Sequence, residues 1–204
     1  MIGEYLSEIV DVADLEARTL NLITAPCGSG KTYFAKTVLK DYNEWYRDDI
    51  LPDMLYLIDS AIGKEQLLHS KGAKIEYNYW TGQEYWVLPD ITVMTYAGYA
   101  TLCNKAPEHN AWKNHKCIIV CDELQNAVSW SKWQKEDNIH DNALGIIAYN
   151  IEMTDNIVVC ITATPKSVLE TFSFCTINEI PLHGIPRHYE NKEEIYYSNL
   201  TLLL

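Results

Sequence analysis

The chain has 204 residues, of which 48% are hydrophobic and 22% charged, so its composition is that of a globular protein and excludes a disordered or collagen-like chain. Its 16 basic and 28 acidic residues give a formal net charge of −12, which argues against a nonspecific coat of nucleic acid but leaves room for a local binding groove. No apolar run is long enough to span a bilayer, and the N-terminus has no basic region. We therefore predict a cytoplasmic protein without a membrane partner.

The first predicted element is an amphipathic helix over Gly3–Ala17, with Leu6, Ile9, Val10 and Ala13 on one face. Short apolar runs then alternate with helical patterns. The apolar runs are Leu20–Thr24, Met54–Ile58, Ile91–Thr95, Cys117–Cys121 and Ile157–Ile161, and the helical patterns are Lys31–Lys40, Gly63–Lys71, Ala97–Asn104, Asn142–Met153 and Lys166–Phe172. This alternation predicts an α/β fold, in which a mostly parallel sheet has helices on both faces.

Segment Lys74–Pro89 interrupts this alternation. Two aromatic-rich stretches flank Thr81-Gly82-Gln83, which predicts an inserted β-hairpin. Its aromatic side chains could stack on unpaired bases, or pack on the sheet or on a partner. No repeat, low-complexity tract or linker divides the chain, so we expect residues 1–204 to form one domain.

Six cysteines are spread along the chain without the C-x-x-C or Cys/His spacing of a metal site. Four of them lie within or beside apolar runs. We therefore expect buried, reduced thiols, as in a cytosolic protein.

A glycine-rich loop follows the first predicted strand and opens a helix. Its sequence is A-P-C-G-S-G-K-T, and the expected phosphate-binding residues are Pro26, Cys27, Gly28, Ser29, Gly30, Lys31 and Thr32. The two glycines allow successive N–H groups to point at phosphate oxygens, and the start of the helix adds its positive dipole end. Lys31 would reach the β- and γ-phosphates, while the Thr32 hydroxyl would ligate Mg²⁺. The loop therefore predicts ATP and magnesium binding.

The run Cys117–Cys121 leads directly into Asp-Glu-Leu-Gln, which places two carboxylates at the carboxyl edge of the sheet. Asp122 would hold Mg²⁺ through water, and Glu123 would polarise the attacking water. We also expect Trp130 and Trp133, at i, i+3 spacing, to form a buried helical face.

Another strand end carries two hydroxyls, in Thr162-Ala163-Thr164-Pro165. Thr162 and Thr164 could hydrogen-bond the carboxylates and couple the presence of the γ-phosphate to movement. The same residues also suit a helix N-cap followed by proline, and both interpretations can hold together.

These elements together resemble the superfamily 2 helicases, the DEAD/DEAH-box and related group. The loop at Ala25–Thr32 resembles motif I with Cys27 in place of a threonine, Asp-Glu-Leu-Gln resembles motif II, and Thr-Ala-Thr-Pro resembles motif III. Met94–Ala97 is similar to motif Ic, and the segment from Ile58 to Gln66 stands where motif Ia belongs, without the family's arginine. The resemblance implies a RecA-like P-loop NTPase domain and tentative nucleic-acid contacts at Ser60 and Thr95.

The resemblance also implies what the chain does. We expect a helicase-type ATP hydrolase that uses ATP and Mg²⁺ on DNA or RNA, with weak turnover until a second RecA-like domain or an oligomer partner completes the site. We expect that second domain to be absent from residues 1–204. An alternative is a stand-alone ATP-binding switch or adaptor that acts on a protein partner, which the acidic composition favours. A small-molecule kinase is disfavoured, because the three arginines are scattered and would not furnish a lid.

Overall fold

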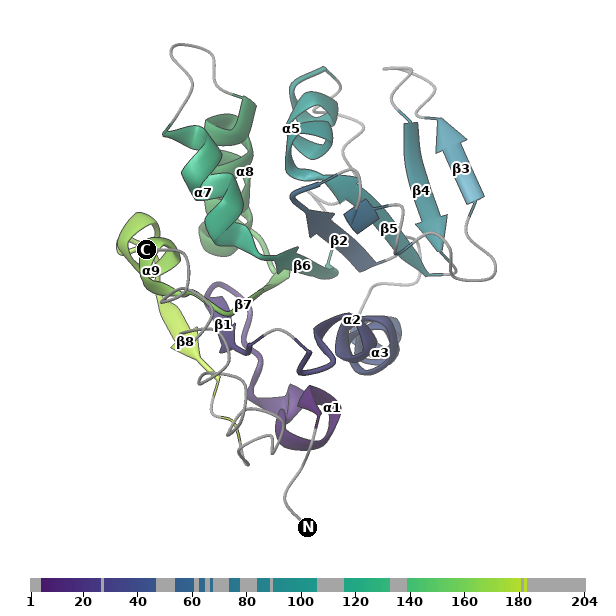
Figure 1. Cartoon of the computed structure of the whole chain (residues 1–204), viewed down its shortest axis with the longest axis vertical. Coiled ribbons are helices and arrows are strands. Elements are labelled where there is room, and N and C mark those ends of the chain that lie inside the picture. The colour runs from purple at the N-terminus through teal and green to yellow at the C-terminus, as the bar shows by residue number, and fades with distance from the viewer. Residues whose placement is uncertain are drawn as a thin grey trace, which may run out of the picture.

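A mixed sheet forms the centre of the computed structural model, with helices on both of its faces (Figure 1). The structure describes residues 5–26, 28–46, 54–60, 63–64, 67, 74–77, 84–88, 90–105, 116–132, 139–180 and 182. Its helical elements are α1 (Leu6–Ile9), η1 (Val12–Asp14), α2 (Lys31–Phe34), η2 (Ala35–Leu39), α3 (Lys40–Tyr46), α5 (Tyr96–Lys105), α7 (Leu124–Ser131), α8 (Ile139–Met153) and α9 (Lys166–Thr171). Its strands are β1 (Leu20–Thr24), β2 (Met54–Ile58), β3 (Lys74–Tyr77), β4 (Glu84–Leu88), β5 (Ile91–Thr95), β6 (Ile118–Asp122), β7 (Ile157–Thr162) and β8 (Ile177–Glu179).

The strand order is β3-β4-β5-β2-β6-β7-β1-β8. The six strands from β5 to β8 in this order pair in parallel, whereas β3 and β4 pair antiparallel with each other and β4 pairs antiparallel with β5. The predicted α/β class and mostly parallel sheet are therefore confirmed. The predicted hairpin is confirmed as a backbone element, and it extends the sheet at the edge beyond β5.

Two apolar clusters cover the two faces of the sheet. Because side chains alternate along a strand, Leu55 and Leu57 of β2 face α5, α7, α8 and α9, while Met54, Tyr56 and Ile58 face the side of α1, α2 and α3. Burying a large apolar side chain contributes about 1.5–3 kcal/mol, so a continuous buried strand favours a layer of helices on each face. The expected helices on both faces are confirmed.

The predicted N-terminal helix is wrong in its extent. A single α-helical turn forms at Leu6–Ile9, Val10 and Asp11 are extended, and the separate 3₁₀ turn η1 follows at Val12–Asp14. The Asp11 side chain accepts a hydrogen bond from the Ala13 N–H at 2.9 Å, which caps η1 and keeps Asp11 extended, so α1 does not continue through it. Ala13 is consequently exposed, although Leu6, Ile9 and Val10 are buried as predicted.

Other elements differ from their predictions in smaller ways. The helix predicted at Lys31–Lys40 continues to Tyr46 through a π-helical turn at Ala35–Leu39, and β8 was not predicted. Trp130 was expected on a buried face but is 53% exposed, because α7 turns Leu124, Ala127 and Val128 to the core instead. Trp133, Gln66 and most of Gly63–Lys71 lie outside the described residues.

The described cysteines are all free and buried, as expected: Cys103, Cys117, Cys121, Cys160 and Cys175. Burial raises the pKa of the Cys175 thiol to about 11, so it stays protonated. Among the residues that the structure describes, no helix has the length and apolar character needed to cross a membrane.

Candidate nucleotide-binding site

The glycine-rich loop joins β1 to α2 and has the backbone conformation that its sequence predicts. Gly28 and Gly30 have φ angles of 84° and 79°, in the left-handed region that favours glycine. The buried Ser29 hydroxyl donates to the Pro26 carbonyl at 2.9 Å, which ties the loop to itself. Lys31 and Thr32 then begin α2, while Cys27 lies outside the described residues.

The N-terminal segment at Tyr5 and Leu6 packs against the same loop. The Leu6 N–H donates to the Ser29 carbonyl at 3.0 Å. A Cβ placed on Gly30 would lie 3.2 Å from Cδ1 of Tyr5, so the segment leaves almost no space for a side chain there. The loop is therefore held between β1 and the beginning of the chain.

The acidic pair, Asp122 and Glu123, lies at the carboxyl end of β6. Glu123 has a φ of 49°, unusual for a residue with a side chain, and its N–H donates to the Ile161 carbonyl of β7 at 3.0 Å. This turn separates the two carboxylates, so that Asp122 is still part of the strand and Glu123 precedes α7.

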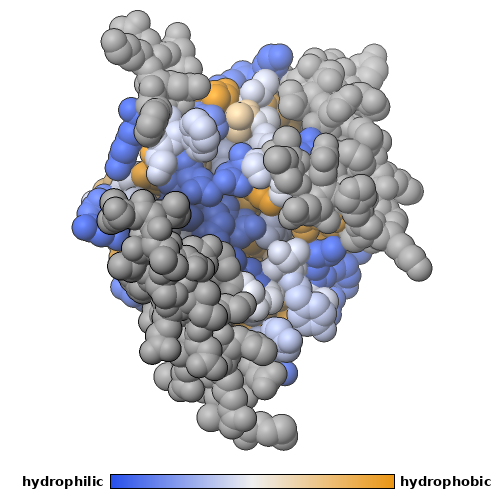
Figure 2. Space-filling model, viewed as in Figure 1, coloured by the Kyte–Doolittle hydropathy of each residue, from blue (hydrophilic) through white to orange (hydrophobic). Residues whose placement is uncertain are grey.

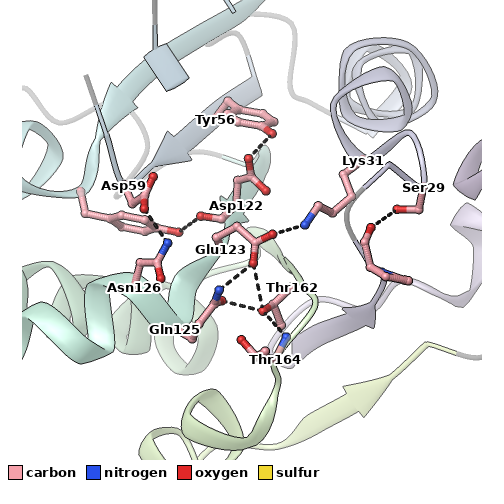
Figure 3. A network of polar contacts seen from close by, with 12 residues as sticks. Ser29, Lys31, Tyr56, Asp59, Asp122, Glu123, Gln125, Asn126, Thr162 and Thr164 are labelled. Carbon is pink, nitrogen blue, oxygen red and sulfur yellow. Dashed lines mark hydrogen bonds and ion pairs between the residues drawn. The ribbon is translucent and has the colours of Figure 1, made fainter. Parts of the chain in front are cut away.

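Glu123 lies at the centre of a polar network that joins three strand ends (Figure 3). Its Oε1 accepts a hydrogen bond from Lys31 Nζ. Its Oε2 accepts from Gln125 Nε2 at 2.6 Å and from the Thr162 hydroxyl at 3.3 Å. Gln125 Oε1 also lies 2.5 Å from the Thr162 hydroxyl. The predicted residues Lys31, Glu123 and Thr162 are thus brought together, with Gln125 between them.

Opposing effects act on the pKa of Glu123. Partial burial raises it, but the hydrogen bonds from Lys31 and Gln125 and the charge of Lys31 outweigh that effect, so the pKa lies below its ordinary value. Glu123 is therefore an anion at neutral pH, as a group that accepts a proton from water must be.

Asp122 is held by two buried tyrosines. The Tyr56 hydroxyl donates to Asp122 Oδ2 at 2.9 Å, and the Tyr96 hydroxyl donates to the Asp122 carbonyl at 3.0 Å. Its other carboxylate oxygen, Oδ1, is buried and has no hydrogen-bond partner among the residues that the structure describes. Burial raises the pKa of Asp122, although the Tyr56 hydrogen bond and the Lys31 charge lower it in part.

The residues present fit a magnesium ion. Mg²⁺ prefers oxygen ligands and is usually held by one or two protein groups together with phosphates and water. The unpartnered Asp122 Oδ1 has free lone pairs, and the exposed Thr32 adds a hydroxyl. No cluster of three or more His, Cys, Asp or Glu side chains occurs in the described parts of the chain.

Thr164 joins the site through its backbone. Its N–H donates to the Thr162 hydroxyl at 3.0 Å, and its side chain is exposed. The helix that follows begins after Pro165, which occupies the N-cap position without a side-chain cap. The expected proline at the start of the helix is therefore confirmed, whereas the expected side-chain N-cap is wrong.

Ser60 and Thr95 lie at the same edge of the sheet, because β2 and β5 pair in parallel with Ile58 opposite Thr95. Both hydroxyl oxygens accept a backbone N–H from the chain that follows, Ser60 from Gly63 and Thr95 from Gly98, at 3.1 Å each. Their side chains therefore stabilise the turns after β2 and β5.

A further contact links this part of the edge to the acidic pair. Asn126 Nδ2 donates to Asp59 Oδ2 at 2.5 Å, which connects the end of β2 to the first turn of α7 (Figure 3). Hydrophilic residues also gather in the middle of the face seen in Figure 2.

Sequence reasoning missed Tyr56, Tyr96 and Asn126, and it quoted Gln125 without assigning it a role. A signal existed for Tyr56, because a tyrosine inside an otherwise apolar strand needs a partner for its hydroxyl. The identity of that partner depends on the strand order, which places β2 beside β6.

The phosphate loop, the carboxyl-edge acidic pair and the parallel sheet define a P-loop domain of the helicase type. The family model of the type III restriction enzyme res subunit matches residues 3–167. The chain belongs to this family, and the matched region is a superfamily 2 helicase-type RecA-like domain. Such domains generally use ATP and Mg²⁺. No curated protein matches the chain.

Proposed function

We propose that this domain hydrolyses ATP with Mg²⁺ and couples hydrolysis to DNA or RNA once a second RecA-like domain or an oligomer partner completes the site. One observation carries the proposal. Lys31, Glu123 and Thr162 come from three separate segments and meet in one network at the carboxyl edge of the sheet. An ordinary glycine-rich turn would not need that network.

In this proposal the loop N–H groups of Gly28 to Lys31 bind the phosphates, and the Lys31 ammonium pairs with β- and γ-phosphate oxygens. Thr32 and Asp122 would hold the magnesium ion, which supplies charge neutralisation on the phosphates when it is bound. Glu123 takes a proton from the attacking water as the new O–P bond forms and the bond to the ADP oxygen breaks.

Gln125 and Thr162 keep Glu123 in place through this exchange. Lys31 must turn from Glu123 Oε1 to the phosphates when ATP binds, whereas the hydrogen bonds of Gln125 and Thr162 are made to Oε2. The carboxylate therefore stays oriented after it loses the lysine. Because Thr164 donates to the Thr162 hydroxyl, this contact also connects the site to the segment that leads into α9.

The nucleic-acid part of the proposal rests on Ser60 and Thr95. They lie at the edge of the sheet that also carries the nucleotide site, and the Asp59–Asn126 hydrogen bond joins the two regions. A local groove at this edge is compatible with the net charge of −12, which disfavours only nonspecific binding.

The test is ATP hydrolysis by the purified chain, alone and with single-stranded DNA, duplex DNA or RNA. We expect Glu123→Gln to retain ATP binding and to lower turnover by about 100-fold or more, the usual contribution of a general base. Glu170→Gln, the same change at an exposed position on α9, is the control and should leave turnover unchanged.

Two results would contradict the proposal. Equal turnover by wild type and Glu123→Gln would contradict the proposal that Glu123 takes a proton from the attacking water. ATP binding with turnover that none of the nucleic acids changes, even with a second RecA-like domain supplied, would favour the nucleotide-dependent switch instead.

A further inference from the structure

Tyr56 is an unusual residue for the middle of a buried strand. It is fully buried in β2, on the face of the sheet that carries α2, and it stands opposite Val120 of β6 in the parallel pairing. Asp122 lies two residues further along β6, on the same face as Val120. The tyrosine ring therefore brings its hydroxyl from an apolar layer to the acidic end of the neighbouring strand.

The Tyr56 hydroxyl makes one well-defined contact there. It donates to Asp122 Oδ2 at 2.9 Å (Figure 3), while Asp122 Oδ1 is buried and has no hydrogen-bond partner in the described part of the chain. The Thr32 side chain also interacts with the Tyr56 hydroxyl, and Lys31 is close enough for its charge to act on Asp122. The Tyr56 phenol thus hydrogen-bonds one of the two side chains that we expect to hold magnesium, Asp122, and lies near the other, Thr32.

We propose that Tyr56 is a positioning residue of the magnesium site, which fixes the Asp122 carboxylate through Oδ2 and leaves Oδ1 free for the ion or its bound water. This inference rests on the proposed function. A carboxylate that is already oriented loses less conformational freedom when the ion binds. Mutation of a residue that hydrogen-bonds a metal ligand typically lowers the metal affinity by about 10–100-fold.

The fold itself supplies a matched control. Tyr99 is also fully buried, and its hydroxyl accepts a hydrogen bond from Asn150 Nδ2 at 3.1 Å, in the layer between α5 and α8. Tyr99→Phe therefore disturbs a buried tyrosine hydroxyl as Tyr56→Phe does, but on the other face of the sheet.

The experiment measures binding of a fluorescent ATP analogue while Mg²⁺ is titrated, and again in excess EDTA. We expect Tyr56→Phe to raise the Mg²⁺ concentration for half-maximal binding by about tenfold and to leave binding in EDTA unchanged. Tyr99→Phe should behave as wild type in both measurements. Thermal unfolding of each variant checks that it is folded.

The outcomes separate this inference from the function on which it rests. If Mg²⁺ strengthens binding of the analogue to wild type, but Tyr56→Phe needs the same or less Mg²⁺, the inference is overturned and the proposed function stands. If the analogue does not bind to wild type with or without Mg²⁺, the proposed function itself fails. An equal rise in Tyr99→Phe would show a general effect of stability and would also overturn the inference.

Discussion

Asp122 shows how a single residue can lower the stability of the fold in favour of a binding site. Its Oδ1 atom is buried and has no hydrogen-bond partner among the described residues, and burial raises the pKa of the carboxyl group. The charged form is therefore less favourable in the folded chain than in the unfolded chain. A bound cation would remove this penalty.

This penalty predicts that Asp122→Asn stabilises the free domain and abolishes magnesium-dependent turnover. The asparagine keeps an oxygen for the Tyr56 hydroxyl and carries no charge, so we expect the free energy of unfolding to rise by about 0.5–2 kcal/mol near pH 7. A raised carboxyl pKa lowers stability only where the group is ionised. The stability advantage of Asp122→Asn over wild type should therefore shrink as the pH falls through the pKa that Asp122 has in the folded chain.

Thermal and urea unfolding without nucleotide, at several pH values from neutral down to about 4, the ordinary pKa of an aspartate, measure this difference. The matched variant is Asp155→Asn, because Asp155 is an exposed partner of Arg18 and should show no such gain. A variant less stable than wild type at every pH would show that the buried charge is compensated, contrary to the prediction.

At the scale of elements, two glycines have opposite roles. Gly30 has a φ of 79° at the start of α2, and an added Cβ would press on Tyr5, whereas Gly145 lies inside α8 with open space around it. We expect Gly30→Ala to destabilise the domain by about 1 kcal/mol or more and to weaken ATP binding. Gly145→Ala should stabilise it by about 0.5–1 kcal/mol, because alanine favours a helix interior.

Urea unfolding of the two variants and of wild type checks both signs, and ATP binding checks the first. The pair is informative because the same methyl group is added each time. Destabilisation by Gly145→Ala, or a Gly30→Ala variant that binds ATP as wild type does, would contradict the account of the loop.

The elements also show how far the sequence alone predicts the structure. β1, β2 and β5 have the bounds that their apolar runs predict, since a strand buried on both faces is apolar along most of its length. The N-terminal helix was wrong because the local bond at Asp11 stops it, and apolar spacing alone contains no information about that bond.

The site was predictable only in part, for a related reason. Lys31, Glu123 and Thr162 each follow a predicted strand, and carboxyl ends of parallel strands share one edge, so their meeting could be expected. The Tyr56–Asp122 contact joins residues 66 positions apart and exists only because β2 is the neighbour of β6. Strand order comes from the packing of the whole sheet, which no local pattern specifies.

At the scale of the whole molecule, the described residues form one side of the proposed phosphate-binding site. Among the described residues, Arg18 is the one arginine. Its Nη2 atom lies 3.2 Å from Asp155 Oδ1, and these two residues precede β1 and β7 in the chain. This is the amino edge of the sheet, opposite the nucleotide site. An arginine at the transferred phosphate contributes about 10³–10⁵ in rate in related nucleotidases, and no described residue of this chain is placed to provide it.

The proposed function predicts slow ATP turnover by the chain alone, and faster turnover when a second RecA-like domain or an oligomer partner completes the site. If a second copy can do so, the rate per molecule rises with protein concentration and follows the oligomer population in size-exclusion chromatography. If a separate RecA-like domain is required, the rate stays low at every concentration until that domain is added. Fast, nucleic-acid-stimulated turnover by a species shown to be monomeric would contradict both possibilities, because it would mean that this chain carries its own phosphate-contacting arginine.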